Sequence, residues 1–153
     1  MKQFTSKTQK IGALGEKICK KFLMKHDFHI IEQNYTQSFG EIDIIAEKNN
    51  VIHFIEVKSI QNKNVSYETK SNNVSRETKS KEEKVSYETK YNPAENFTHD
   101  KYKKVLQTAL FFLENDKNKK ERHKKWQIDL YLVYIDPQNI KHKIKRIENV
   151  IFS

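Results

Sequence analysis

Asp43, Glu56 and Lys58 have the residue types and spacing that a metal-dependent phosphodiesterase requires. They lie in two segments rich in β-branched residues, which flank the polar, turn-prone stretch 47–50. This pattern predicts a β-hairpin. Its strands are expected at 40–46 and 51–58. Because side chains alternate between the faces of a strand, Glu56 and Lys58 should point to the same side.

Asp43 and Glu56 are flanked by aliphatic residues, so both carboxylates should be partly buried. A buried charge is costly unless it is paired or binds a metal, and two converging carboxylates repel each other. A divalent cation would remove that conflict, and hard oxygen ligands favour Mg²⁺ or Mn²⁺. Lys58 would orient a water molecule or stabilise charge on a phosphate. The alternative is that Glu56 and Lys58 form an ion pair on an exposed sheet face.

Asp43 followed by Glu56-Val57-Lys58 resembles the D…(D/E)-x-K core of the PD-(D/E)XK nucleases. The wider pattern is similar to the YraN family of bacterial endonucleases, which are akin to archaeal Holliday-junction resolvases. A lone D…E-x-K is a weak motif, whereas an ordered set is specific. The matching pieces are Gly12–Glu16, Asn34-Tyr35, Gly40–Asp43, Glu56–Lys58, Thr98 with Lys101, Ile128-Asp129 and Ile147–Asn149.

The resemblance implies a role for each matching residue. Asp43 and Glu56 would be the metal ligands and Lys58 the lysine of the motif. Glu16 would be an acid on a helix that extends the site directly or through water, with a solvent-facing helix acid as the alternative. Lys101 would contact phosphate near a helix start, with an ordinary exposed lysine as the alternative. Ile42 stands where many members of the superfamily have proline, and members vary there. Glu41 is a secondary candidate that alternatively caps the strand start.

The periodicity of apolar residues predicts the remaining elements. Helices are expected at about 8–26 and 98–115, and further strands at 28–34, 126–135 and 144–152, the last at the sheet edge. Gly15 inside the first helix suggests a close approach of helix and sheet, and Cys19 should be a small buried residue. The order predicts an α/β fold, a restriction-endonuclease-like three-layer sandwich with a mixed sheet of about five strands, in a single domain over 1–153.

Residues 60–95 carry three near-copies of one short sequence, at 65–70, 74–79 and 85–90. Their charges nearly cancel and apolar residues are sparse. We interpret the segment as an inserted surface loop, flexible or forming a projecting hairpin. Since it follows Lys58 directly, it would lie near the mouth of the site, either as a tolerated loop or as a lid or DNA contact.

The formal net charge is +9, with basic clusters in the first helix, in a loop before the fourth strand and near the C-terminal strand. Such clusters attract polyanions, although lysine-rich surfaces are often only solvated faces. Next to a phosphodiester site they favour nucleic-acid binding. The loop candidates are Lys119, Lys120, Arg122, Lys124 and Lys125, together with Lys117.

Several classes of function lack support in the sequence. No apolar run could span a bilayer, the N-terminal residues lack the apolar core of a secretory signal, and one cysteine cannot form an internal disulfide, so we expect a cytoplasmic protein. There is no Gly-rich phosphate loop and no histidine spacing typical of a metal site. His53 is expected to pack opposite Glu56, and Asp129 to pair with a basic neighbour.

The sequence therefore predicts a Mg²⁺- or Mn²⁺-dependent endonuclease acting on DNA, on branched or repair intermediates. A water activated by the metal and positioned by Lys58 would attack phosphorus in line. The resemblance to junction-cleaving enzymes implies a homodimer. The alternatives are a non-catalytic basic nucleic-acid-binding accessory protein with a nuclease fold and a protein-interaction module that uses the repeat segment.

Overall fold

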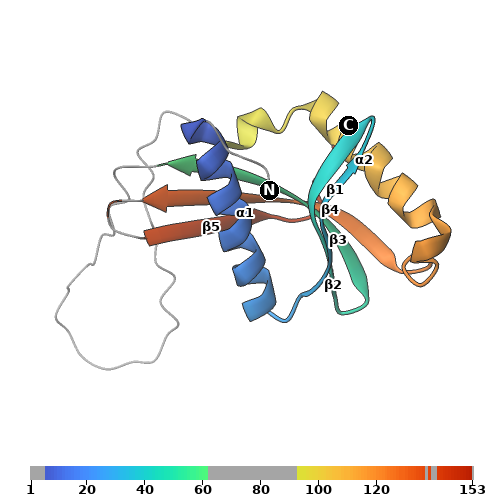
Figure 1. The fold of residues 1–153 in the computed structure, drawn as a ribbon. Coiled ribbons are helices and arrows are strands. Elements are labelled where there is room, and N and C mark those ends of the chain that lie inside the picture. Colours follow the sequence, from blue (N-terminus) through green and yellow to red (C-terminus); the bar gives the residue numbers. More distant parts are fainter. Residues whose placement is uncertain (1–5, 62–92, 137, 139–140, 153) are drawn as a thin grey trace, which may run out of the picture.

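In the part of the chain that the structure describes, five strands form one mixed sheet in the order β1-β2-β3-β4-β5 (Figure 1). The computed structural model describes residues 6–61, 93–136, 138 and 141–152. The β3–β4 pair is parallel, and the three other neighbouring pairs are antiparallel. The elements are α1 (Lys7–Lys25), β1 (His29–Gln37), β2 (Gly40–Lys48), β3 (Val51–Gln61), η1 (Pro93–Asn96), α2 (His99–Glu114), η2 (Asp116–Asn118), β4 (Lys125–Asp136) and β5 (Lys141–Ile147).

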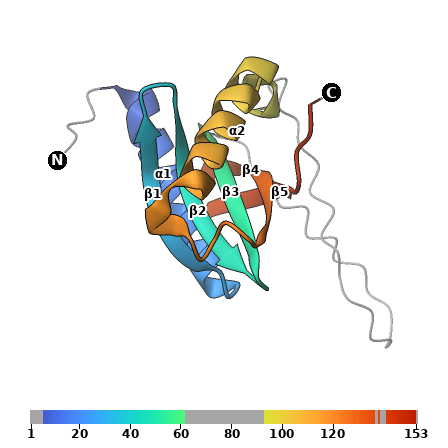
Figure 2. The same cartoon turned by 90° about the vertical axis from the view of Figure 1, so that its right-hand side faces the viewer.

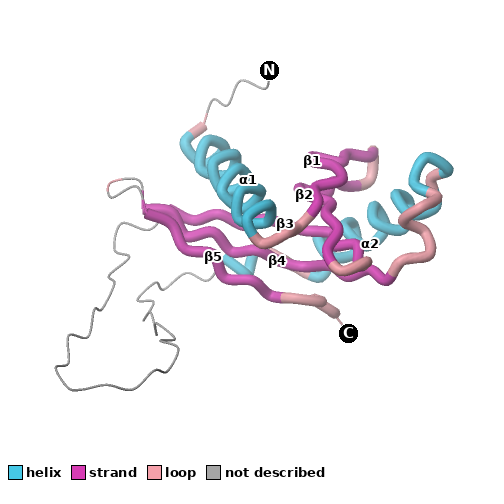
Figure 3. The backbone as a smooth tube through the Cα atoms, turned by 90° about the horizontal axis from the view of Figure 1, so that it is seen from below, coloured by secondary structure: helices cyan, strands magenta, loops and turns pink. Residues whose placement is uncertain are grey.

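The two long helices cover opposite faces of the sheet (Figure 3). Cys19 and Leu23 of α1 are fully buried against a cluster that includes Val57 and Tyr131. On the other face α2 crosses β2 and β3 (Figure 2). Phe112 of α2 packs against Phe54 of β3. The predicted α/β sandwich with a mixed sheet flanked by helices is confirmed. Among the described helices, none is both long and apolar enough to cross a bilayer.

Helix α1 is positioned by its N-cap residue and by a glycine in its middle. Ser6 caps the helix through a reciprocal hydrogen-bonded box with Gln9, which satisfies free amides of the first turn. A Cβ atom at Gly15 would collide with the side chain of Ser59 on β3. The predicted close approach of helix and sheet is therefore real, and Glu16 is the next residue of α1 after this contact.

The β2–β3 hairpin closes through a two-residue turn. Asn49 and Asn50 have φ of 51° and 61°, and positive φ at both central positions matches the twist of the strands. Strand pairing runs from Lys48 with Val51 to Ile44 with Ile55. Ile42 and Ile45 belong to the same core cluster, so the strict alternation predicted for β2 is interrupted between them.

The strand limits differ from the sequence expectation at three places. β1 continues to Gln37, β3 reaches Gln61, and the final strand is 141–147 rather than 144–152. Asn149 ends the extended path because its φ is 48°. The edge position of β5 is confirmed. The inserted segment predicted at 60–95 lies for the most part outside the described residues, which resume at Pro93.

Candidate active site

Asp43 lies where β2 separates from β3. Regular pairing of the two strands ends at Ile44 and Ile55, and Asp43 Oδ2 accepts the backbone N–H of Val57 at 2.7 Å. A side-chain oxygen therefore satisfies a main-chain donor at the end of the ladder. This bond fixes the carboxylate beside the residue that follows Glu56.

Glu56 is buried, with 3% of its side chain exposed, and it lies between two lysines. Its Oε1 is 2.7 Å from Lys58 Nζ and 3.4 Å from Lys101 Nζ. Its Oε2 is also buried and accepts no hydrogen bond from the described residues. The ion pair of Glu56 and Lys58 therefore exists, but the reading that places Glu56 on an exposed face is wrong.

Lys101 joins the site from the first turn of α2, where Thr98 caps the helix through the Lys101 N–H. The side chain of Lys101 is 25% exposed and is turned toward Glu56, so it is not an ordinary surface lysine. Its Nζ is also 3.9 Å from Glu41 Oε1. The side chain of Glu41 is 55% exposed, which places it at the rim of the site.

Charged groups from both layers act on Asp43. Desolvation, the charge of Glu56 and the charge of Glu16 raise its pKa to about 8, against the lowering effects of the Val57 N–H and Lys101. The pKa of Cys19 is also raised, by burial first and then by Asp43 and Glu16. The charge of Glu16 thus acts on both Asp43 and Cys19. This fits the predicted place of Glu16 beside Asp43 rather than a purely solvent-facing place.

The site has the donor types of a cation site but not a completed one. Asp43, Glu56 and Glu16 bring carboxylate oxygens to one region, which suit a hard divalent cation. In the described ranges, no three histidine, cysteine or acidic side chains are already gathered closely enough to hold a metal ion. A cation would therefore have to draw Glu16 or water into its coordination shell.

Most of the predicted basic loop lies away from these carboxylates. Lys125 pairs with Val51, five residues before Glu56 on β3, which corresponds to about 17 Å along a strand. Arg122 donates to the carbonyl oxygens of Leu113 and Glu114 at 3.3 and 2.7 Å and so closes the end of α2. Lys124 pairs with Glu47 at 2.7 Å. Lys119, Lys120 and Lys125 are exposed.

The opposite face of the sheet holds a second polar group that the sequence reasoning did not find. His53 Nδ1 is 2.8 Å from Asp129 Oδ2, and Arg146 approaches the same oxygen at 3.2 Å. The predicted pairing of Asp129 with basic neighbours is confirmed, and His53 lies opposite Glu56 as expected. His53 and Asp129 are 76 positions apart in sequence, so no local spacing signals their contact. Only the parallel β3–β4 register brings them together.

Together these features define an α/β sandwich protein in which a buried carboxylate, Glu56, and a half-buried one, Asp43, lie with two lysines at a strand split. The chain belongs to the uncharacterised protein family UPF0102, whose model matches residues 15–133. It is similar to the UPF0102 proteins of Campylobacter lari (53% identical over 57 residues), Campylobacter hominis (48% over 63) and Aliarcobacter butzleri (46% over 71). These matches cover 37%, 41% and 46% of this chain. They span 51%, 54% and 61% of the relatives' own length.

Proposed function

We propose that this protein is a metal-dependent endonuclease that hydrolyses phosphodiester bonds in DNA. The observation that carries the proposal is the pair formed by Asp43 and Glu56, two carboxylates that burial and mutual repulsion leave in conflict. Such a conflict between neighbouring acids is typical of sites that hold a cation. Lysines directly beside the pair provide positive charge for an anionic substrate.

The residues fit a hard divalent cation. Glu56 Oε2 is buried without a hydrogen-bond donor from the described residues, so an oxygen is left for a ligand. Asp43 is held in place through Oδ2 by the Val57 N–H. Asp43 and Glu56 would hold Mg²⁺ or Mn²⁺, with Glu16 contributing directly or through water. When bound, the ion would supply Lewis-acid stabilisation of phosphate charge and a lowered pKa for a water ligand.

The two lysines would act on the substrate from the same side as Glu56. Lys58 would orient the attacking water and stabilise charge that develops on the phosphate. Lys101, at the N-terminal end of α2, would hold a neighbouring phosphate where the free amides of the helix also favour an anion. Both ammonium groups now contact Glu56, so both are already within the site.

The choice of substrate and setting belongs to the same proposal. The D…E-x-K arrangement resembles that of the PD-(D/E)XK nucleases, and the net charge of +9 favours a polyanion. We infer that the substrate is branched DNA or a repair intermediate, that two copies pair to act on it, and that the protein works in the cytoplasm. The family is uncharacterised, so the substrate and the pairing of two copies rest on the site and on the resemblance.

Cleavage of labelled DNA tests the proposal. Linear duplex, single-stranded and four-way-junction DNA would be incubated with the purified protein in Mn²⁺, Mg²⁺ or EDTA, beside Asp43→Ala and Lys58→Ala. We expect cutting that requires the metal and is lost in both variants. Binding without cleavage, equal in all three proteins, would instead identify a non-catalytic nucleic-acid-binding protein.

A further inference from the structure

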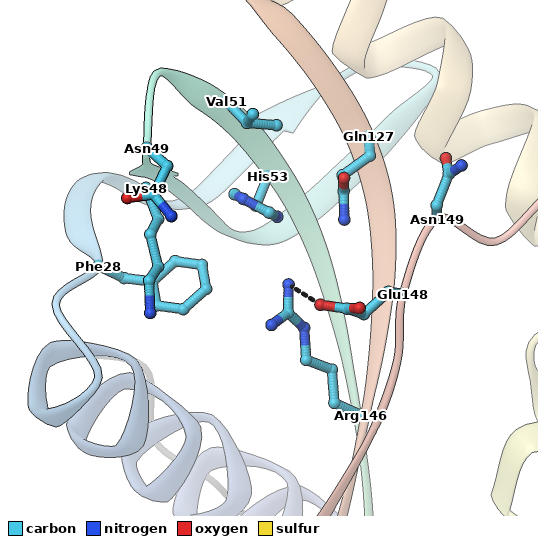
Figure 4. A pocket seen from close by; sticks show the side chains of 9 residues that line it. All are labelled: Phe28, Lys48, Asn49, Val51, His53, Gln127, Arg146, Glu148 and Asn149. Atoms are coloured by element: carbon cyan, nitrogen blue, oxygen red, sulfur yellow. Dashed lines mark ion pairs between the residues drawn. The ribbon is translucent and has the colours of Figure 1, made fainter.

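A cavity of about 300 Å³ opens on the α1 side of the sheet, beside the β2–β3 turn (Figure 4). Its walls include Phe28, Lys48, His53, Gln127, Arg146 and Glu148. His53 and Glu56 point to opposite faces of β3, so this cavity is separate from the carboxylate pair. Its volume is at the lower end of the range of about 300–1,000 Å³ for small-molecule sites.

Asp129 organises the polar wall of the cavity. Its Oδ1 accepts Gln127 Nε2 at 2.7 Å and the Asn149 N–H at 2.9 Å, and its Oδ2 accepts His53 and Arg146. Burial opposes ionisation, yet the hydrogen bonds from His53, Asn149 and Gln127 hold the pKa of Asp129 below its ordinary value. The carboxylate is therefore charged at neutral pH and acts purely as an acceptor.

The hydrogen bonds to Asp129 determine which polar atoms of His53 and Gln127 remain available to a ligand. Because Asp129 is an acceptor only, His53 Nδ1 must donate to it, and in the neutral form of the ring Nε2 is then an acceptor. Gln127 gives its amide nitrogen to Asp129, which leaves the amide oxygen as a second acceptor. His53 and Gln127 are paired in the β3–β4 register, so the two acceptors are carried by neighbouring strands, whose backbones lie about 5 Å apart.

The charges around the cavity balance. Lys48 and Arg146 carry two positive charges, and Asp129 and Glu148 carry two negative charges. Arg146 contacts both carboxylates, at 3.2 and 2.7 Å. A strongly charged ligand would have to break one of these pairs, whereas a neutral ligand would leave them intact.

The remaining wall is aromatic. The Phe28 ring is buried and meets the His53 ring edge to face, with 5.1 Å between their centroids. Lys48 Nζ and Arg146 Cζ lie 5.0 and 5.4 Å from the centroid of Phe28. The cavity therefore combines the aromatic ring of Phe28, the planar guanidinium of Arg146 and the planar amide of Gln127 with adjacent hydrogen-bond acceptors. Such a set of groups suits a planar polar molecule.

We propose that this cavity binds a nucleobase, a neutral planar heterocycle whose exocyclic amino group is held by His53 Nε2 and Gln127 Oε1. Arg146 and Lys48 provide donors for the acceptor atoms of the same base. The base can come from a free nucleoside or from an unpaired position of a nucleic-acid strand, because both present the same edge. Adenine, cytosine and guanine carry the amino group, and uracil does not.

Calorimetric titration of the full chain with adenosine, cytidine, guanosine and uridine tests this assignment. We expect saturable binding of at least one amino-bearing nucleoside and about tenfold weaker binding of uridine, as follows from the loss of a hydrogen bond to a buried acceptor. Gln127→Leu should weaken binding by about tenfold, and Val51→Phe, which fills the mouth, should abolish it. The matched control Gln107→Leu, on the exposed side of α2, should bind as the wild type does.

The outcomes separate this cavity from the nuclease site. Asp43→Ala should keep full nucleoside binding even if all cleavage is lost. Competition by a single-stranded oligonucleotide would identify a strand as the source of the base, and failure to compete would identify the free nucleoside. No saturable binding of any nucleoside, or equal binding in Val51→Phe with its fold intact by circular dichroism, would overturn the assignment. Binding of inorganic phosphate in place of nucleosides would overturn it as well.

Discussion

The carboxylate of Asp43 accepts the backbone N–H of Val57 at 2.7 Å, at the position where the β2–β3 ladder has already ended. The separation of the strands makes room for the carboxylate, and the carboxylate in turn satisfies the donor that the separation exposes. One oxygen of Asp43 is thereby fixed, while Glu56, the residue before Val57, faces Lys58 and Lys101. The hairpin thus positions both acids through a single backbone unit.

Asp43→Asn should stabilise the metal-free protein above about pH 5. Because the folded-state pKa is raised from 3.8 to about 8, the folded chain binds this proton more tightly than the unfolded chain. The stability that this group contributes is complete at low pH and is lost as the pH rises through about 8. Asparagine carries no charge and can still accept the Val57 N–H. We expect a gain of about 1–3 kcal/mol near pH 8, measured by urea unfolding.

Asp27→Asn is the matched control for that measurement, because Asp27 is an exposed aspartate in the turn after α1. It should leave the pH dependence of unfolding as in the wild type. A stability curve for Asp43→Asn that runs parallel to the wild type between pH 5 and 8 would contradict the strained acid pair.

The positions of Glu56 and Lys58, and the turn that precedes their strand, are predictable from the sequence. Alternation along 51–58 places Glu56 and Lys58 on one side, and their 2.7 Å ion pair confirms it. The polar residues 47–50 predict the turn, which Asn49 and Asn50 form. The separation of the strands at Asp43 was not predictable, because it depends on how β2 leaves β3 in three dimensions and not on any residue pattern.

Lys101→Met should reduce cleavage by about tenfold to a hundredfold while leaving the fold intact. Lys101 Nζ lies 3.4 Å from Glu56 Oε1 and lowers the pKa of Asp43, so its loss removes positive charge from both acids. Single-turnover rates would be compared with those of Lys103→Met, an exposed lysine on the same helix. Equal cleavage rates in the two variants would show that Lys101 does not contribute to cleavage.

Gly15→Ala and Gly12→Ala should change stability in opposite directions. A Cβ at Gly15 would strike Ser59, so we expect a loss of about 1–3 kcal/mol from overpacking. No atom lies within 4 Å of a Cβ at Gly12, so alanine should gain up to about 1 kcal/mol through helix propensity.

Thermal unfolding of both glycine variants measures the difference, and Ser59→Gly should restore part of the loss in Gly15→Ala. A neutral Gly15→Ala substitution would show that α1 can move away from β3. The place of Glu16 beside Asp43 would then not depend on this contact.

Other parts of the molecule could not be read from sequence because they depend on long-range register. The charges of Arg122 and Lys124 suggest nucleic-acid contacts but do not reveal their partners within the chain, which are the end of α2 for Arg122 and Glu47 for Lys124. The apolar residues predict a final strand that runs to residue 152, whereas β5 ends at Ile147 and Asn149 donates its N–H to Asp129. A run of β-branched residues does not show where a distant side chain will accept a hydrogen bond from the backbone and so end the strand.

Calorimetric titration of the metal-free protein with Mn²⁺ tests the central claim most directly, because the claim is that Asp43 and Glu56 form a cation site. We predict saturable binding to the wild-type chain, lost in Asp43→Asn and retained in Asp27→Asn. The absence of saturable binding to the wild type, or equal binding in Asp43→Asn, would contradict the account.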